Sequence, residues 1–231
     1  MNTTNNDNNQ QQNTERNLPN ALLKGFVNLA GYGFFGLVHV FRLPYSFMKK
    51  RGRENKEFNM SQNIQFPLNG QGVGVLKDLR IGRHNFSHSG CGAIATFNAM
   101  SMAGCEPKIE EIVEFYERKG LILYATMGVN PLGVKRYLSQ QDVKWTKYSG
   151  KQDWDACLKD GQVGIMLYWW ANAKGCGAHY VAVEKLEDGV RVYNVYNTRD
   201  CSFTYKDIQT FLASGSYRKI VALFVIDRKE N

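Results

Sequence analysis

The 231-residue sequence lacks the cysteine patterns of a disulfide-stabilised scaffold or a structural zinc site. It has five cysteines, an odd number, and they are irregularly spaced. No two of them have zinc-ribbon spacing. Such a set argues against a disulfide framework and favours a reducing compartment. We therefore expect a cytoplasmic protein.

The sequence also lacks a stripe of Lys and Arg with interleaved aromatic residues. The formal net charge is +8, but residues 1–56 carry eight Lys/Arg against three Asp/Glu and so account for +5 of it. Only +3 remains on the other 175 residues. Because a nucleic-acid platform needs concentrated positive charge, we expect no nucleic-acid partner for the main part of the chain.

A long hydrophobic run is the third absence. The run "GFVNLAGYGFFGLVHV" has 16 residues, whereas a membrane-spanning helix needs roughly 20. The basic run "KKRGR" follows it, and an apolar segment beside basic residues can lie on an anionic membrane surface. Two interpretations of residues 21–53 stay open: contact with a membrane surface or a partner, or packing on the domain followed by a solvated basic linker.

The N-terminal 20 residues have almost no apolar side chains. They are rich in Asn, Gln and Thr, and such a segment cannot bury enough surface to offset the entropy of ordering. It also lacks the charged start and apolar centre of a signal peptide. We expect a disordered tail over 1–20, an apolar and basic segment with a linker over 21–61, and one folded domain over 62–231.

Helical patterns precede strand patterns within the folded domain. This order predicts an α+β fold in which N-terminal helices pack on a C-terminal antiparallel sheet. The expected helices are 91–103, which is apolar on most faces, 108–119, 130–141 and a short one within 151–161. The expected strands are 163–170, 179–186, 190–196 and 220–226.

Cys91 stands at the start of the apolar helix, in the stretch "NFSHSGCGAIA". Unpaired backbone N–H groups and the helix dipole favour negative charge there and lower the pKa of a cysteine. The flanking Gly90 and Gly92 would leave the sulfur accessible and let a substrate backbone approach. The alternative is a structural cysteine in a buried helix.

A nucleophile needs a base, and His179 is the best placed of four histidines. It opens the strand "HYVAV" after the glycine-bearing loop "AKGCG". Asn194 and Asn197 follow on the next strand and supply a group that could orient the imidazole. Cys, His and Asn in this order are typical of thiol hydrolases. His84, His88 and Cys91 also suggest a zinc site, but no acidic or cysteine pair completes the set, so we expect no metal and no cofactor.

The region from about 82 to 197 resembles the papain-like peptidases that process bacteriocin leaders, and their stand-alone relatives. That family carries Cys-Gly at a helix start, then His before a valine-rich strand, a glycine turn and an Asp about 16 residues after the His. Here Cys91-Gly92, "HYVAV" and "DGVRVYN" match, which puts Asn194 at the Asp position. The resemblance implies a papain-like fold and a peptidase activity.

Two departures from the family pattern concern Asn85 and the orienting residue. The family has Gln six residues before the Cys, where this sequence has Asn85; by resemblance it would donate to an oxyanion, and otherwise it is a turn residue. The interval from His179 is 15 residues to Asn194 and 18 to Asn197. A three-residue hairpin loop at 187–189 pairs His179 with Asn197, whereas the motif favours Asn194.

The sequence therefore predicts a cysteine peptidase that acts on a peptide or protein substrate. Its site residues are Cys91, His179, Asn194 and Asn85. Two alternatives stay open: a non-catalytic papain-like module that binds peptides, and an amide-transfer enzyme of the transglutaminase kind.

Overall fold

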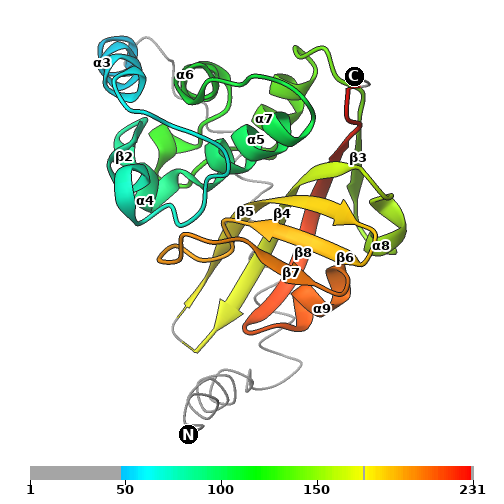
Figure 1. Ribbon diagram of the computed structural model, residues 1–231. Helices are drawn as coiled ribbons and strands as arrows, with labels where there is room; N and C mark the ends of the chain where they lie inside the picture. Colours follow the sequence, from blue (N-terminus) through cyan, green and yellow to red (C-terminus); the bar gives the residue numbers. More distant parts are fainter. Residues whose placement is uncertain (1–47, 174, 230–231) are drawn as a thin grey trace, which may run out of the picture.

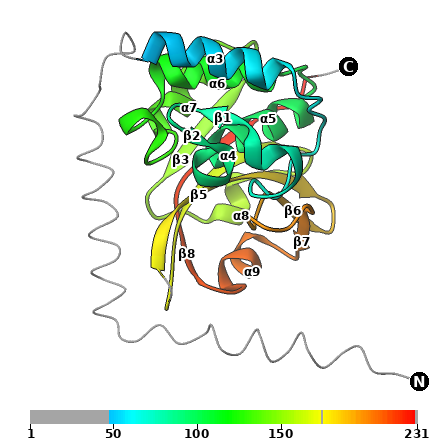
Figure 2. The ribbon, with the colours of Figure 1, turned by 90° about the vertical axis from the view of Figure 1, so that its left-hand side faces the viewer.

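A computed structural model describes residues 48–173 and 175–229 of the chain. The predicted tail 1–20 and the apolar part of the segment 21–61 lie outside these residues. Helices occupy the N-terminal half of the described chain and an antiparallel sheet the C-terminal half, which confirms the α+β order. Figure 1 shows the helices above the sheet, and Figure 2 shows the same two layers from the side.

The helical layer is built around one buried helix, α5. It contains α3 (Lys49–Met60), η2 (Gly74–Asp78), the short pair β1 (Arg80–Ile81) and β2 (His84–Asn85), α4 (Phe86–Ser89), α5 (Cys91–Met102), α6 (Ile109–Lys119), η3 (Leu123–Ala125) and α7 (Pro131–Leu138). All residues of α5 except Cys91 and Ser101 are buried, and the helix contacts α6, β4 and β5. The apolar sequence on most faces of this helix thus matches its central position.

The sheet has six antiparallel strands in the order β3-β8-β4-β5-β6-β7. Its elements are β3 (Trp145–Ser149), α8 (Trp154–Cys157), β4 (Val163–Asn172), β5 (Gly175–Leu186), β6 (Gly189–Tyr193), β7 (Phe203–Tyr205), α9 (Ile208–Ala213) and β8 (Tyr217–Ile226). Alternate side chains of β4 enter two cores, with Ile165 and Leu167 on the α5 side and Met166 and Tyr168 on the side of α8 and α9. The period of two along each strand therefore fills both faces.

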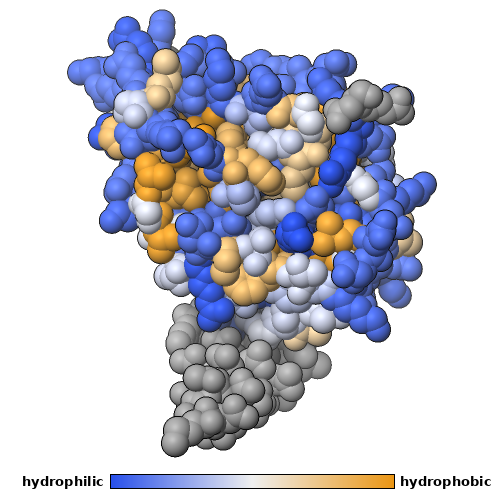
Figure 3. Space-filling view, viewed as in Figure 1, coloured by the Kyte–Doolittle hydropathy of each residue, from blue (hydrophilic) through white to orange (hydrophobic). Residues whose placement is uncertain are grey.

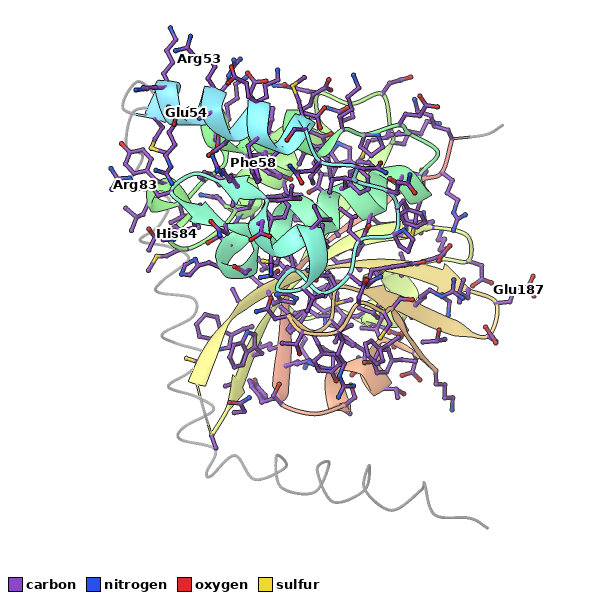
Figure 4. The ribbon with its side chains drawn as sticks, turned by 60° about the vertical axis from the view of Figure 1, so that its left-hand side comes forward. Arg53, Glu54, Phe58, Arg83, His84 and Glu187 are labelled. Carbon is purple, nitrogen blue, oxygen red and sulfur yellow. The ribbon has the colours of Figure 1, made fainter. Side chains whose placement is uncertain are left out.

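The β5–β6 hairpin differs from the three-residue loop that would pair His179 with Asn197. Leu186 pairs with Gly189, so the loop is the two residues 187–188, and the three-residue loop was wrong. Figure 4 shows Glu187 at the tip, away from the helices. The pairing ends at Ala182 and Tyr193, because the next residue, Asn194, turns into the left-handed region with φ of 59°. Within the described chain, β5 has no β6 partner from Gly175 to Val181.

The folded domain begins earlier than residue 62. The basic run that we assigned to a linker opens α3, which contacts α6 and β1. Gly52, Asn55 and Asn59 form its buried side, whereas Arg53 and Glu54 project outward in Figure 4. Arg51 Nε donates to the Gly82 carbonyl over 3.0 Å. This part of the segment is therefore integrated into the helical layer by polar contacts.

Two observations concern the surface. Figure 3 shows one face, on which hydrophobic residues gather where the helical layer meets the sheet and hydrophilic residues surround them. Of the helices within 48–173 and 175–229, none is both long enough and apolar enough to cross a membrane. Most of the segment proposed for membrane contact, residues 21–47, lies outside the described part.

Candidate functional site

A pocket of about 450 Å³ lies where the start of α5 meets the unpaired edge of β5. Cys91 and His179 both line it, so the structure brings together the predicted nucleophile and base. Its other walls come from segments distant in the sequence. They include Gln71, His88, Tyr168, Trp170, Tyr196, Asn197 and Arg218.

Cys91 is the first residue of α5 and is partly buried. Burial raises the pKa of its thiol, while hydrogen bonds from the backbone of Tyr180, of Gly92 and of Cys91 itself lower it in part. The Tyr180 contact exists because the β5 edge carries no neighbouring strand at this point. The thiol is thus held by amide N–H groups in a pocket that favours its neutral form.

The glycines beside Cys91 serve internal packing, which differs from our expectation of an open approach for a substrate. A Cβ on Gly92 would lie 2.7 Å from two carbon atoms of Val129. A Cβ on Gly90 would collide with the side chain of Phe86. Both glycines allow close contact, but the contact is with the loop 121–129 and with α4 rather than with the pocket.

His179 lies on β5 opposite Tyr168 of β4. The two rings meet edge to face, with centroids 5.8 Å apart. Nε2 of His179 lies 2.7 Å from the backbone carbonyl oxygen of Asn194. Because a carbonyl oxygen only accepts, Nε2 carries the proton and Nδ1 of the neutral ring keeps its lone pair. Burial lowers the pKa of His179, and the Arg218 cation lowers it further.

Asn194 touches His179 through its backbone, not through its side chain. Its side chain is buried, and Oδ1 accepts from the backbone N–H of Gln71 over 3.2 Å. Its own N–H donates to Asn69 Oδ1 over 2.8 Å. These bonds hold the left-handed turn that aims the carbonyl at the imidazole. Asn197 lines the pocket, and its backbone carbonyl accepts a hydrogen bond from Gly72 N–H. Among the described residues, no hydrogen bond joins Asn197 to His179.

Gln71 is a site residue that the sequence reasoning missed. It is buried, lines the pocket and is tied to Asn194 by its backbone. Its Nε2 lies 3.4 Å from the Ser87 carbonyl and its Oε1 3.4 Å from Asn194 Nδ2, so these bonds are long. The only local signal is its position between Gly70 and Gly72, where a Cβ would collide with Arg199 and Asn197 respectively.

The structure does not bring Asn85 to the pocket. Asn85 is exposed, pairs with Arg80 in the β1–β2 ribbon and precedes α4 without a side-chain cap. His84 and His88 stack with centroids 4.2 Å apart, and His88 reaches the pocket rim. In residues 48–173 and 175–229 no three His, Cys, Asp or Glu side chains form a group able to hold a metal ion.

No protein-family model matches the chain, and no curated protein matches it either. The functional argument therefore depends on the residues of the pocket.

Proposed function

We propose that the protein is a cysteine peptidase, or a related thiol acyl-transfer enzyme, with a papain-like arrangement of Cys91 and His179. The observation that carries the proposal is that both residues line one pocket, with Nε2 of the imidazole held by a carbonyl so that Nδ1 is the basic nitrogen. The α5 helix start beside an antiparallel strand is consistent with the resemblance of the sequence to papain-like peptidases.

The proposed reaction begins with a neutral thiol and a neutral imidazole, which is the pair that burial of both groups favours. Nδ1 of His179 takes the thiol proton as the sulfur attacks an amide carbonyl, and the new imidazolium then protonates the leaving amine. Water, deprotonated by the same nitrogen, hydrolyses the resulting thioester. The Asn194 carbonyl keeps the ring orientation throughout.

The oxyanion of the tetrahedral intermediate needs hydrogen-bond donors. The backbone N–H of Cys91 lies at the helix start, and Gln71 offers a carboxamide in the same pocket. We propose these two groups as the donors. Asn85, the sequence-based candidate, is exposed and does not line the pocket, so we assign it no role in the reaction.

Replacement of the nucleophile tests the proposal. Cys91→Ala should abolish cleavage of a peptide library, followed by mass spectrometry, and leave the far-ultraviolet circular dichroism spectrum and the melting temperature close to those of the unchanged protein. Cys176→Ala is the matched control, because Cys176 is exposed and is not among the residues that line the pocket. Undiminished cleavage by the Cys91→Ala protein would refute the mechanism.

A non-catalytic peptide-binding module is the second candidate. The raised pKa of Cys91 favours it, because a thiol held in its neutral form is a weak nucleophile. A thiol-directed peptide electrophile separates the candidates: an enzyme is labelled at Cys91 far faster than at the other four cysteines. Slow labelling at an equal rate on all five would support the binding module.

We also propose a reducing compartment such as the cytoplasm for this activity. None of the five cysteines is paired in the structure, and Cys176 and Cys201 are exposed. Exposed thiols persist where the redox poise keeps them reduced.

A further inference from the structure

The pocket beside Cys91 and His179 contains a buried positive charge. Arg218 lies in β8 opposite Trp170 of β4, is only 8% exposed and lines the pocket. Its guanidinium carbon lies 5.7 Å from the centroid of the Tyr168 ring, and the centroid of the same ring is 5.8 Å from that of His179. Tyr168 therefore connects the cation to the proposed base.

The charge of Arg218 is not compensated by the part of the protein that the structure describes. Its Nη1 donates to the Phe211 carbonyl over 2.7 Å and to Ser214 Oγ over 2.9 Å, and its Nε is buried without a hydrogen-bond partner there. The Tyr205 hydroxyl is a further polar neighbour. All of these are neutral groups, and the ion pairs between described residues involve other side chains.

The walls of the pocket contain no acidic residue among those that line it. Besides Arg218, the ionisable side chains there are Cys91, His88, His179 and two tyrosines. Removing a cation from water is costly unless an anion is paired with it. An unpaired cation in the wall of a pocket is available to an anionic ligand, and a carboxylate is a planar group that a guanidinium binds in a bidentate way.

We propose that Arg218 binds a carboxylate of the substrate in this pocket and so selects acidic substrates. The reaction on that substrate rests on the proposed function, whereas the binding of the carboxylate does not. The carboxylate has two sources: an Asp or Glu side chain near the cleaved bond, or the free carboxyl terminus of a peptide.

Two small alkylating reagents test the anion preference directly. Iodoacetate and iodoacetamide react alike: the thiolate sulfur forms a bond to carbon and iodide leaves, but only iodoacetate carries a carboxylate. The rate with iodoacetate divided by the rate with iodoacetamide at Cys91 does not depend on the reactivity of the thiol itself. Exposed Cys176 and Cys201 supply the reference ratio in the same molecule. One partly buried charge should raise the ratio at Cys91 about tenfold above that reference.

Two variants assign that preference to Arg218. Arg218→Gln should reduce the Cys91 ratio to that of Cys176 and Cys201, while Arg218→Lys should retain part of the preference because it keeps the charge. Equal ratios at Cys91 and the exposed cysteines of the unchanged protein would overturn the proposal. So would a preference that survives in a folded Arg218→Gln protein.

Replacing Arg218 also removes its hydrogen bonds to Phe211 and Ser214, so a measurement on the unchanged protein tests the preference without any change to the fold. Acetate should protect Cys91 from iodoacetamide, and acetamide at the same concentration should not. Equal protection by both would contradict the proposal. If Cys91 shows the carboxylate preference but is not labelled by a peptide electrophile, the proposed function is refuted and the carboxylate proposal stands.

Peptide substrates then distinguish the two sources of the carboxylate. Amidated peptides with Glu near the cleaved bond are compared with their Gln counterparts, and peptides with a free carboxyl terminus with their amides. A preference of about tenfold for the charged member of either pair supports the proposal and identifies the source. Cleavage of all four at equal rates would show that the enzyme acts but that Arg218 does not select carboxylates.

Discussion

At the scale of single residues, the group that orients His179 is a backbone carbonyl. A carbonyl fixes the tautomer of the ring as a carboxamide oxygen does, but its position is set by the conformation of Asn194 rather than by a side-chain rotamer. The φ of 59° at Asn194 is tolerated by Asn better than by most residues. The identity of residue 194 therefore acts on the site through the backbone.

Substitution of Asn194 distinguishes these two modes of action. Asn194→Gly keeps the left-handed turn and the carbonyl, whereas Asn194→Ala retains a Cβ, which costs about 1–2 kcal/mol relative to glycine in this conformation. We expect the alanine variant to be the less stable by that amount in urea unfolding and to be labelled more slowly at Cys91 by a peptide electrophile. Both variants lose the hydrogen bond from Gln71 N–H to the Asn194 side chain, so this loss does not contribute to the difference between them. If both variants lose the same stability and the same labelling rate, the side chain of Asn194, rather than its backbone conformation, supports the site.

The partly buried imidazole of His179 also predicts a dependence of stability on pH. The pKa of His179 is lowered from 6.5 by burial, so below pH 6.5 the unfolded chain binds a proton that the folded chain does not. The free energy of unfolding should therefore fall as the pH falls through 6.5. His179→Gln, which keeps a donor for the Asn194 carbonyl, should lose less stability over the same range in urea titrations. A gain in stability of the unchanged protein in acid would contradict a lowered pKa of His179.

At the scale of elements, the start of α5 is positioned by its contact with the loop 121–129. Gly92 touches Val129, and Ser89 Oγ donates to the Ala125 carbonyl within a run of three left-handed residues, Leu123 to Ala125. This loop therefore contacts the helix start directly. Packing there should therefore control the placement of Cys91.

Enlarging Gly92 tests this packing. A Cβ at 2.7 Å from Val129 forces a shift, so Gly92→Ala should destabilise the protein by about 1–3 kcal/mol. Val129→Ala alone should also destabilise it, because Val129 is buried. The double variant removes Cγ2 of Val129 but keeps its Cβ, the other carbon 2.7 Å away. The collision is therefore relieved in part, and the combined loss should be smaller than the sum of the two single losses. Additive losses in urea unfolding would show that the two residues act independently.

The elements that the sequence predicted are those with a strong apolar period. Helix α6 and strand β4 were found with their ends shifted by at most two residues. Strand β3, the three-residue β7 and α9 were missed, because short or half-exposed elements gain their order from neighbours. Helix α3 was missed because its buried side is Gly52, Asn55 and Asn59, which no apolar pattern marks.

The candidate site was predictable where a local signal existed. Cys91 at a helix start and His179 at a strand carry such signals, and both line the pocket. Gln71 comes from an irregular segment far before Cys91, and only the tertiary fold brings it there. The role of Asn194 depends on a backbone angle, which side-chain patterns do not encode.

At the scale of the whole molecule, buried polar contacts join α3 to the rest of the helical layer. Glu117 of α6 is buried, and burial raises the pKa of its carboxyl. Its Oε1 accepts from Asn55 Nδ2 over 2.6 Å and from Gly82 N–H over 2.8 Å. Asn55 Nδ2 also donates to the Gly82 carbonyl over 3.0 Å. One carboxamide thus links three segments of the chain.

Removing that carboxamide should weaken the whole fold rather than α3 alone. Asn55→Ala removes one of two donors from the buried Glu117 carboxyl, which keeps Gly82 N–H, and one from the Gly82 carbonyl, which keeps Arg51 Nε. Losing buried hydrogen bonds of this kind costs about 1–3 kcal/mol. Lys50→Ala is the matched control on the same helix, because Lys50 is exposed and its ion pair with Glu54 spans 4.0 Å; surface pairs of this kind contribute about 0–1 kcal/mol. Urea unfolding followed by tryptophan fluorescence should show one cooperative transition at lower urea for Asn55→Ala only. If both variants unfold at the same urea concentration, α3 does not contribute to the stability of the folded domain, and the domain boundary lies near residue 62.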